Sequence, residues 1–238
     1  METELPRMLH DRESVVPDER FVFHSSRMRM KHVTPEELER MNSQTERASL
    51  ELADARPDVV ASACLVAIMA QGAGYHCHAE GQITSVLRRE GMDIPVVSSA
   101  GALLRGLGAL GARRIAIVTP YMKPLTKMVA DYMEDAGVEV VDALSLEVSD
   151  NLAVARLDPQ DPQDLREHWR EVDTTGADAL VLSACVQMPS LASIQPVEDE
   201  AGLPVLSAAT ATVFTILTEL GLHPKVPAAG RLLSGASP

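Results

Sequence analysis

Aromatic side chains are scarce in this chain of 238 residues, where Phe, Trp and Tyr together make up 3% of the sequence. Apolar residues nevertheless reach 46%, so Val, Ile, Leu, Ala and Met must fill the core. Aliphatic cores of this kind are typical of parallel strands that helices bury on both faces. The length suits one large α/β unit or two small lobes that share a cleft.

Basic residues are also few, since 21 Lys and Arg stand against 34 Asp and Glu, and the net charge is −13. An acidic surface repels phosphate backbones, which argues against a nucleic-acid partner. An anionic small substrate is still compatible with this charge, provided that a local pocket of hydrogen-bond donors binds it.

The chain holds only three cysteines, Cys64, Cys77 and Cys185. An odd and small number in a chain of this length argues against a disulfide scaffold and favours a reducing compartment. No apolar run approaches the roughly 20 residues that a membrane span requires. The first residues are acidic and lack the basic and apolar regions of a signal peptide. We therefore expect a cytoplasmic protein with no membrane partner.

Strand-like apolar runs alternate with helical patterns, which predicts βαβ units and parallel sheets. The expected strands are 20–25, 58–63, 94–98, 114–119, 138–144, 179–183 and 204–207. A helix should begin after Thr34 and run to about Asp54, because Thr34 and Glu37 form a capping-box pattern. The tail after Leu222 is rich in Pro, Gly, Ala and Ser and should be mobile.

An internal repeat divides the chain. The segment 60–69 around Cys64 resembles the segment 180–188 around Cys185, and each is followed by a helix and a second similar strand. The repeat predicts two similar Rossmann-like α/β lobes, 1–105 and 106–214, related by a pseudo-twofold axis. Open α/β sheets bind ligands beyond the carboxyl ends of their strands, so the active site should lie in the cleft between the lobes, with both cysteines in it.

The positions of Cys64 and Cys185 suggest reactive thiols. Each is expected at a strand-to-helix junction, where unpaired backbone N–H groups and the helix dipole favour the thiolate. A single free cysteine is more often a small buried hydrophobe. Two cysteines at equivalent points of a repeat instead favour a catalytic pair.

Metal and nucleotide sites find little support. Cys77 lies in Tyr75-His76-Cys77-His78, but adjacent residues point in different directions and no second ligand pair occurs at zinc-like spacing. The Gly-rich segment 101–111 lacks a phosphate-binding pattern. We therefore expect no metal and no cofactor.

Two polar side chains could complete the site. Tyr121 follows the expected strand 114–119 and could offer its hydroxyl to the cleft or pack between the lobes. Asn151 follows the expected strand 138–144 and could cap the next segment or donate its amide to a carboxylate.

Several segments carry a resemblance to a known family. They are Met1-Glu-Thr-Glu-Leu-Pro6, 24–30, 63–67, Val118-Thr-Pro-Tyr121, Asp150-Asn151 and Ser183-Ala-Cys185. Together with the paired cysteines they resemble the maleate cis-trans isomerases of the aspartate/glutamate racemase superfamily, which also holds arylmalonate decarboxylase and hydantoin racemase. Arylmalonate decarboxylases keep only the second cysteine, so Cys64 argues against that activity.

The resemblance implies cofactor-independent isomerisation of maleate to fumarate in a homodimer. The Cys64 thiolate would add to the alkene, the former double bond would rotate, and elimination would release fumarate. Cys185 would handle a proton or hold the intermediate. The residues assigned to substrate binding are Tyr121, Asn151, Leu65, Val66 and Val186.

Members of the family begin with a strand and a Pro-Ser-Ser-Asn-Thr loop ahead of the segment that matches Met1–Pro6. We therefore expect the first lobe to be N-terminally incomplete, with an unpaired strand edge, and to be completed by 215–238. We also expect the natural protein to be longer.

Two alternatives remain open. A racemase or epimerase of the same superfamily would use the two cysteines as acid and base, and it would exchange the α-hydrogen of its substrate with solvent deuterium. A non-catalytic binder of small carboxylates would have inert cysteines that iodoacetamide labels slowly at neutral pH.

Overall fold

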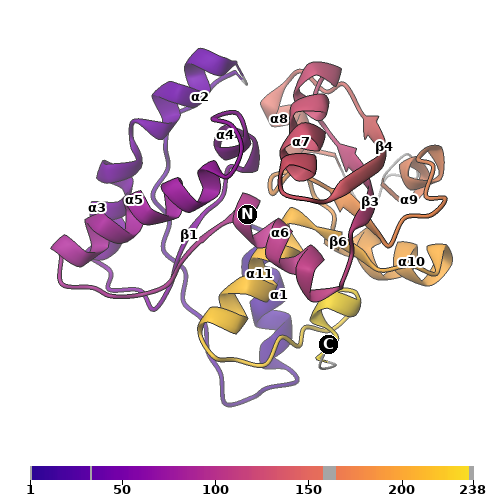
Figure 1. Cartoon of the computed structure of the whole chain (residues 1–238). Helices are drawn as coiled ribbons and strands as arrows, with labels where there is room; N and C mark the ends of the chain where they lie inside the picture. The colour runs from indigo at the N-terminus through magenta and orange to yellow at the C-terminus, as the bar shows by residue number, and fades with distance from the viewer. Residues whose placement is uncertain (1, 33, 158–164, 236–238) are drawn as a thin grey trace.

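The computed structural model describes residues 2–32, 34–157 and 165–235, which form two parallel β-sheets with helices around them (Figure 1). One sheet has the order β1-β2 and the other has the order β4-β3-β5-β6. The strands are β1 (Val60–Ser62), β2 (Val96–Ser98), β3 (Arg114–Thr119), β4 (Glu139–Ser145), β5 (Ala179–Ser183) and β6 (Val205–Ser207). The predicted α/β class with parallel sheets is confirmed.

Helices account for most of the remaining chain. They are α1 (Glu4–Glu13), α2 (Pro35–Asn42), α3 (Thr45–Ala53), α4 (Leu65–Met69), α5 (Tyr75–Arg89), α6 (Ser99–Ala109), α7 (Lys123–Asp135), α8 (Asn151–Ala155), α9 (Leu165–His168), α10 (Leu191–Ala201) and α11 (Ala208–Glu219). In Figure 1, α2, α3 and α5 lie on the side of β1, and α7, α9 and α10 lie on the side of the larger sheet. The helices α6 and α11 pack against each other between the two groups, and α1 lies beside α11.

The internal repeat is visible in how two strands end. Ser98 ends β2 and its hydroxyl accepts a hydrogen bond from the N–H of Gly101, 3.1 Å away. Ser207 ends β6 and its hydroxyl accepts from the N–H of Thr210, 3.2 Å away. Both serines thus cap the helix that follows, α6 or α11, which satisfies an N–H group that a helix start leaves unpaired.

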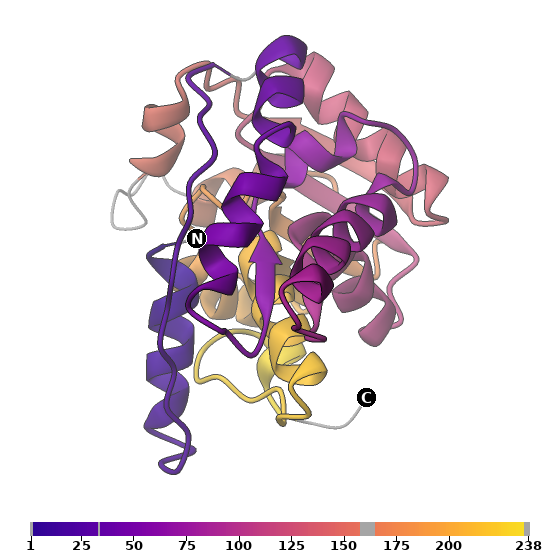
Figure 2. The same ribbon diagram turned by 90° about the vertical axis from the view of Figure 1, so that its left-hand side faces the viewer.

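The strand predicted at 20–25 is wrong, because this segment is extended but pairs with no strand in the described part of the chain. A cavity of about 400 Å³ lies between it and β1, lined by Phe21 and Val60 among others. In the described residues β1 pairs only with β2. Figure 2 shows the segment between α1 and α2, extended over residues 19–30, running along the outside of the molecule.

The helix predicted from Thr34 to Asp54 is interrupted and forms α2 and α3. Half of the predicted capping box is present, since Thr34 Oγ1 accepts from the N–H of Glu37 at 3.3 Å. The Glu37 carboxylate does not return to Thr34. It accepts instead from the N–H groups of Lys31 and His32, at 2.6 and 2.8 Å.

The C-terminal segment was predicted to be mobile, but residues 223–235 pack on the fold. Leu232 and Leu233 are buried, and the N–H of Val226 donates to the carbonyl of Leu233 at 2.8 Å. The segment is fixed to α1 by Arg12, a side chain only 1% exposed. Its guanidinium donates to the backbone carbonyls of His223 and Lys225, the second at 2.8 Å.

Arg12 should contribute strongly to stability. Besides its two carbonyl partners, it donates through Nε and Nη2 to the Glu19 carboxylate, both at 2.7 Å. We expect Arg12→Met to lower the free energy of unfolding by about 3 kcal/mol, because it leaves a carboxylate and two carbonyls without their donor. The hydrogen bond from Arg12 also holds the pKa of Glu19 below its usual value. The part of the stabilisation that comes from the Arg12–Glu19 pair should therefore be lost as the pH falls through that lowered pKa.

Urea unfolding of both the variant and a matched control measures the effect. Arg7→Met is the control, since Arg7 is on the same helix but 69% exposed and 3.7 Å from Asp11. Exposed pairs of this kind contribute about 0–1 kcal/mol. Equal losses of stability in the two variants would contradict the assigned role of Arg12.

Candidate active site

Cys64 lies where the first sheet gives way to a helix. The strand β1 ends at Ser62, and Cys64 is the N-cap residue of α4. Its side chain is partly exposed and lines a cavity of about 340 Å³. Val60 to Ala63, the segment 24–28, Val186 and Gln187 contribute to the same cavity. The structure therefore places Cys64 beyond the carboxyl end of a parallel strand and beside residues from the second half of the repeat, as the sequence predicted.

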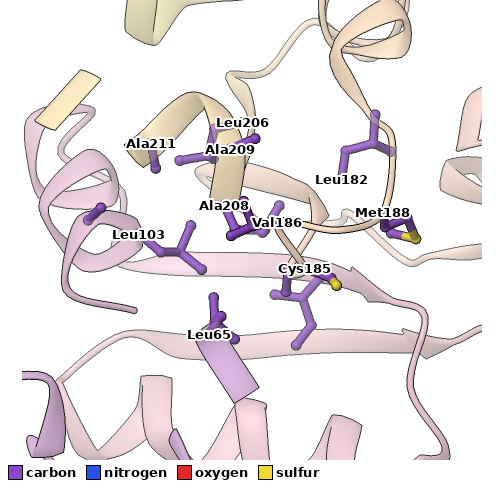
Figure 3. Packing of buried hydrophobic residues seen from close by; sticks show 14 of the residues in the cluster. Leu65, Leu103, Leu182, Cys185, Val186, Met188, Leu206, Ala208, Ala209 and Ala211 are labelled. Atoms are coloured by element: carbon purple, nitrogen blue, oxygen red, sulfur yellow. The ribbon is translucent and has the colours of Figure 1, made fainter. Parts of the chain in front are cut away.

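Cys185 occupies the equivalent place in the larger sheet. The strand β5 ends at Ser183, and Cys185 follows in a loop, with a side chain only 7% exposed. The Ser183 hydroxyl donates to the carbonyl of Cys185 at 2.9 Å, and the carbonyl of Met188 lies 3.4 Å from the same hydroxyl. Figure 3 shows Leu65, the first residue of α4, near the loop that carries Cys185 and Val186, and Cys64 and Val186 line the same cavity. The two cysteine-bearing junctions thus meet at one place.

Tyr121 lies near both Cys64 and Cys185 and follows a third strand. It lies directly after β3, where its carbonyl accepts from the N–H of Glu147 at 3.2 Å and from the Ser145 hydroxyl. Its own hydroxyl hydrogen-bonds Cys185 and lies 3.5 Å from the carbonyl of Ala184. The ring is only 7% exposed. The sequence left open whether Tyr121 offers its hydroxyl to the cleft or packs between the lobes; the structure buries the ring and places the hydroxyl beside Cys185, and its contact with a substrate stays a prediction.

Burial dominates the acid–base properties of these groups. It raises the pKa of Cys64 to about 11, and the nearby N–H of Ala67 offsets this only in part. Burial also raises the pKa of Cys185, against the hydrogen bond from Tyr121. The pKa of Tyr121 lies well above its usual value, first because of burial and then because of the two neighbouring thiols.

These shifts correct the prediction that the helix start favours a thiolate at Cys64 and Cys185. The helix α4 has only five residues, so its dipole is small, whereas removal of an anion from water is costly. Both pKa shifts therefore favour the protonated thiol over the thiolate. Any reaction through a thiolate must include the departure of this proton.

The structure describes the side chains of some of the other residues predicted to bind substrate. Leu65 and Val66 form the buried first turn of α4, and Val186 is buried next to Cys185. Asn151 is the first residue of α8, but its side chain lies outside what the structure describes. The cap of α8 is Asp150, whose carboxylate accepts from the N–H of Leu152 at 2.8 Å.

The Tyr75–His78 segment makes contacts through three of its four side chains. Nδ1 of His76 lies 2.6 Å from the Tyr132 hydroxyl, and the ring of Tyr75 packs against that of His78. Cys77 is exposed on α5. Among the described residues, no group of three or more His, Cys, Asp or Glu is arranged to hold a metal ion.

The sequence analysis did not identify two residues that belong to the candidate site. Ser183 holds the loop that carries Cys185, and Gln187 lines the cavity. The signal for Ser183 was present in Ser183-Ala-Cys185, where a serine ends a buried strand and can return its hydroxyl to the backbone.

Comparison with known proteins gives a consistent result. The model of the family described as arylmalonate decarboxylase matches residues 8–233. A maleate isomerase of Geobacillus stearothermophilus is 56% identical over 235 residues, which are 99% of this chain and 92% of that protein. The crystal structure of a maleate isomerase from Pseudomonas putida S16 with maleate, in a variant with one cysteine replaced by alanine, superimposes with a TM-score of 0.95. It is 53% identical and covers 99% of this chain and 92% of that one.

A second solved structure shows reaction chemistry. It is a Nocardia farcinica maleate cis-trans isomerase in which one cysteine is replaced by serine and which holds a covalently bound succinylcysteine intermediate. Its TM-score to the present structure is 0.93, at 47% identity over 99% of this chain and 94% of that one.

Proposed function

Because this chain belongs to the arylmalonate decarboxylase family, and within it to the maleate isomerases, we propose that it isomerises maleate to fumarate without a cofactor. The observation that carries the proposal is the grouping of Cys64, Tyr121 and Cys185 at the carboxyl ends of three parallel strands. Relatives of about half-identical sequence are isomerases, which favours this reaction over a racemase or a non-catalytic binder.

The proposed reaction begins with attack by Cys64. Its thiol loses a proton to water in the cavity, and the sulfur bonds to one alkene carbon of maleate. The π electrons move towards the adjacent carboxylate, and the neighbouring carbon takes the proton of the Cys185 thiol. The former double bond is now a single bond and can rotate.

The second half reverses these steps. The Cys185 thiolate removes the proton from carbon, the double bond forms again in the trans arrangement, and the bond to the Cys64 sulfur breaks. Cys64 regains a proton from water, and fumarate leaves. Every atom of the substrate returns, so no oxidant, reductant or other co-substrate is needed.

In this proposal the surrounding residues bind the substrate carboxylates and limit the access of water. The Tyr121 hydroxyl and the Asn151 amide donate to the substrate carboxylates, where negative charge increases during attack. Leu65, Val66 and Val186 form an apolar wall that limits water around the reacting carbons. Exclusion of water strengthens each of these hydrogen bonds.

Proton NMR of maleate tests the function directly. We expect the vinyl signal of maleate to be replaced by that of fumarate in the presence of the protein, and no change with heat-denatured protein. Persistence of the maleate signal with folded protein would refute the proposed reaction.

We further propose a homodimer in the cytoplasm. The three cysteines are free, which suits a reducing compartment, and symmetric homo-oligomers are common among soluble proteins. In the described part of the chain, no helix has the length and apolar character to cross a membrane. Sedimentation equilibrium should give twice the mass of one chain, and the mass of one chain would overturn the dimer.

A further inference from the structure

Glu4 makes an unusual long-range contact from the first turn of α1. Its carboxylate is only 8% exposed. One oxygen, Oε1, accepts from the backbone N–H groups of Ser190 and Leu191 at 2.7 and 2.6 Å. The other oxygen, Oε2, lies 3.3 Å from the Ser190 hydroxyl, which donates to it. A side chain 186 residues away in sequence therefore satisfies the start of α10.

The contact takes the place of a local helix cap. Ser190 is the N-cap residue of α10, yet its own side chain makes no capping hydrogen bond within the helix. The carboxylate of Glu4 meets two N–H groups there, at the end of a helix that favours an acidic side chain. The start of α10 is thereby fixed to α1.

The segment fixed in this way is the loop that carries Cys185. Residues 184–190 connect β5 to α10, and a side chain holds the loop at each of its two ends. At the strand end, the Ser183 hydroxyl holds the carbonyl of Cys185. At the helix end, Glu4 holds Ser190 and Leu191.

We propose that Glu4 is a positioning residue for Cys185, an inference that rests on the proposed function for its effect on catalysis. Glu4 contacts no reacting atom in this proposal. It fixes the far end of the loop, so that the Cys185 thiol stays beside Tyr121 and above the substrate carbon. A misplacement of about 1 Å at a proton-transfer group can cost about 100-fold in rate.

Glu4→Gln tests the proposal, because the amide keeps the shape but cannot accept from both backbone N–H groups and the hydroxyl as the carboxylate does. We expect kcat to fall at least about tenfold, with KM changed less than about twofold. Glu4→Asp keeps the charge on a shorter stem and should restore part of the rate. Asp11→Asn, on an exposed face of α1, is the matched control and should leave kcat unchanged.

Cysteine labelling provides a readout that does not depend on activity. We expect iodoacetamide to label Cys185 several-fold faster in Glu4→Gln than in the wild type, with Cys64 and Cys77 labelled at unchanged rates, as peptide mass spectrometry would measure. Should Glu4→Gln not fold, judged by its thermal unfolding, the same labelling on Glu4→Asp replaces it.

The outcomes separate the two proposals. Unchanged kcat and unchanged Cys185 labelling would overturn the positioning role, and so would equal acceleration at all three cysteines, which indicates general loosening. Selective acceleration at Cys185 in Glu4→Gln, together with a wild-type protein that forms no fumarate, would support the positioning role and refute the proposed function.

Discussion

Replacing Cys64 with serine is expected to reduce fumarate formation by at least about 10³-fold. Serine keeps the size of the side chain in its partly exposed place at the start of α4, so the fold should be unaffected. A hydroxyl is far less acidic than a thiol and is a weaker nucleophile, so it cannot add to the alkene at a useful rate. Initial rates from the vinyl proton signals of maleate and fumarate measure the loss.

Cys77→Ser is the matched control for this prediction. Cys77 is exposed on α5 and lies outside the group formed by Cys64, Tyr121 and Cys185. We expect this control to retain the wild-type rate. A Cys64→Ser enzyme that kept more than about a tenth of the activity would show that Cys64 is not the nucleophile.

The order of strands and helices was largely predictable because local patterns determine it. The limits predicted for β3 and β5 agree with the structure, since each is a continuous apolar run buried in the middle of a sheet. The predicted strands 58–63 and 94–98 are shorter in the structure, where β1 and β2 form a sheet of only two strands. The boundary between lobes near residue 105 stays a prediction.

Contacts between distant segments were not predictable. Nothing in a local pattern shows that Arg12 meets the carbonyls of His223 and Lys225, or that Glu4 meets Ser190. The composition after Leu222 therefore predicted a mobile tail, whereas residues 223–235 pack on the fold and residues 236–238 lie outside the described part of the chain. The segment 20–25 has the residues of a strand, but a strand also needs a neighbour with which to pair.

The sequence predicted that Cys64, Tyr121 and Cys185 lie at strand ends, which the structure shows, but it did not predict their electrostatics. The repeat predicted Cys64 and Cys185, and the end of a strand predicted Tyr121. The sign of the cysteine pKa shifts was wrong, because the burial that raises these pKa values depends on how the two halves of the repeat meet. The catalytic roles of Cys64 and Cys185 and the substrate contacts of Tyr121 and Asn151 stay predictions.

Replacing Cys185 with serine is expected to separate attack from elimination. Cys64 can still add to maleate in this variant, and water can slowly supply the proton that the neighbouring carbon takes. Serine cannot act as the thiolate base that removes this proton again, so the adduct on Cys64 should accumulate. We expect fumarate formation to fall by about 10²- to 10⁴-fold, the usual contribution of a positioned acid–base group.

Intact mass spectrometry after incubation with maleate tests whether the adduct accumulates. The Cys185→Ser protein should gain the mass of one maleic acid, and digestion should locate it on the peptide that contains Cys64. The double variant Cys64→Ser/Cys185→Ser is the control and should gain nothing. An adduct that forms equally in the double variant would exclude Cys64 as the attacking group. A single variant that forms fumarate at the wild-type rate would exclude Cys185 from proton transfer and leave Tyr121, which neighbours both thiols, as the candidate donor.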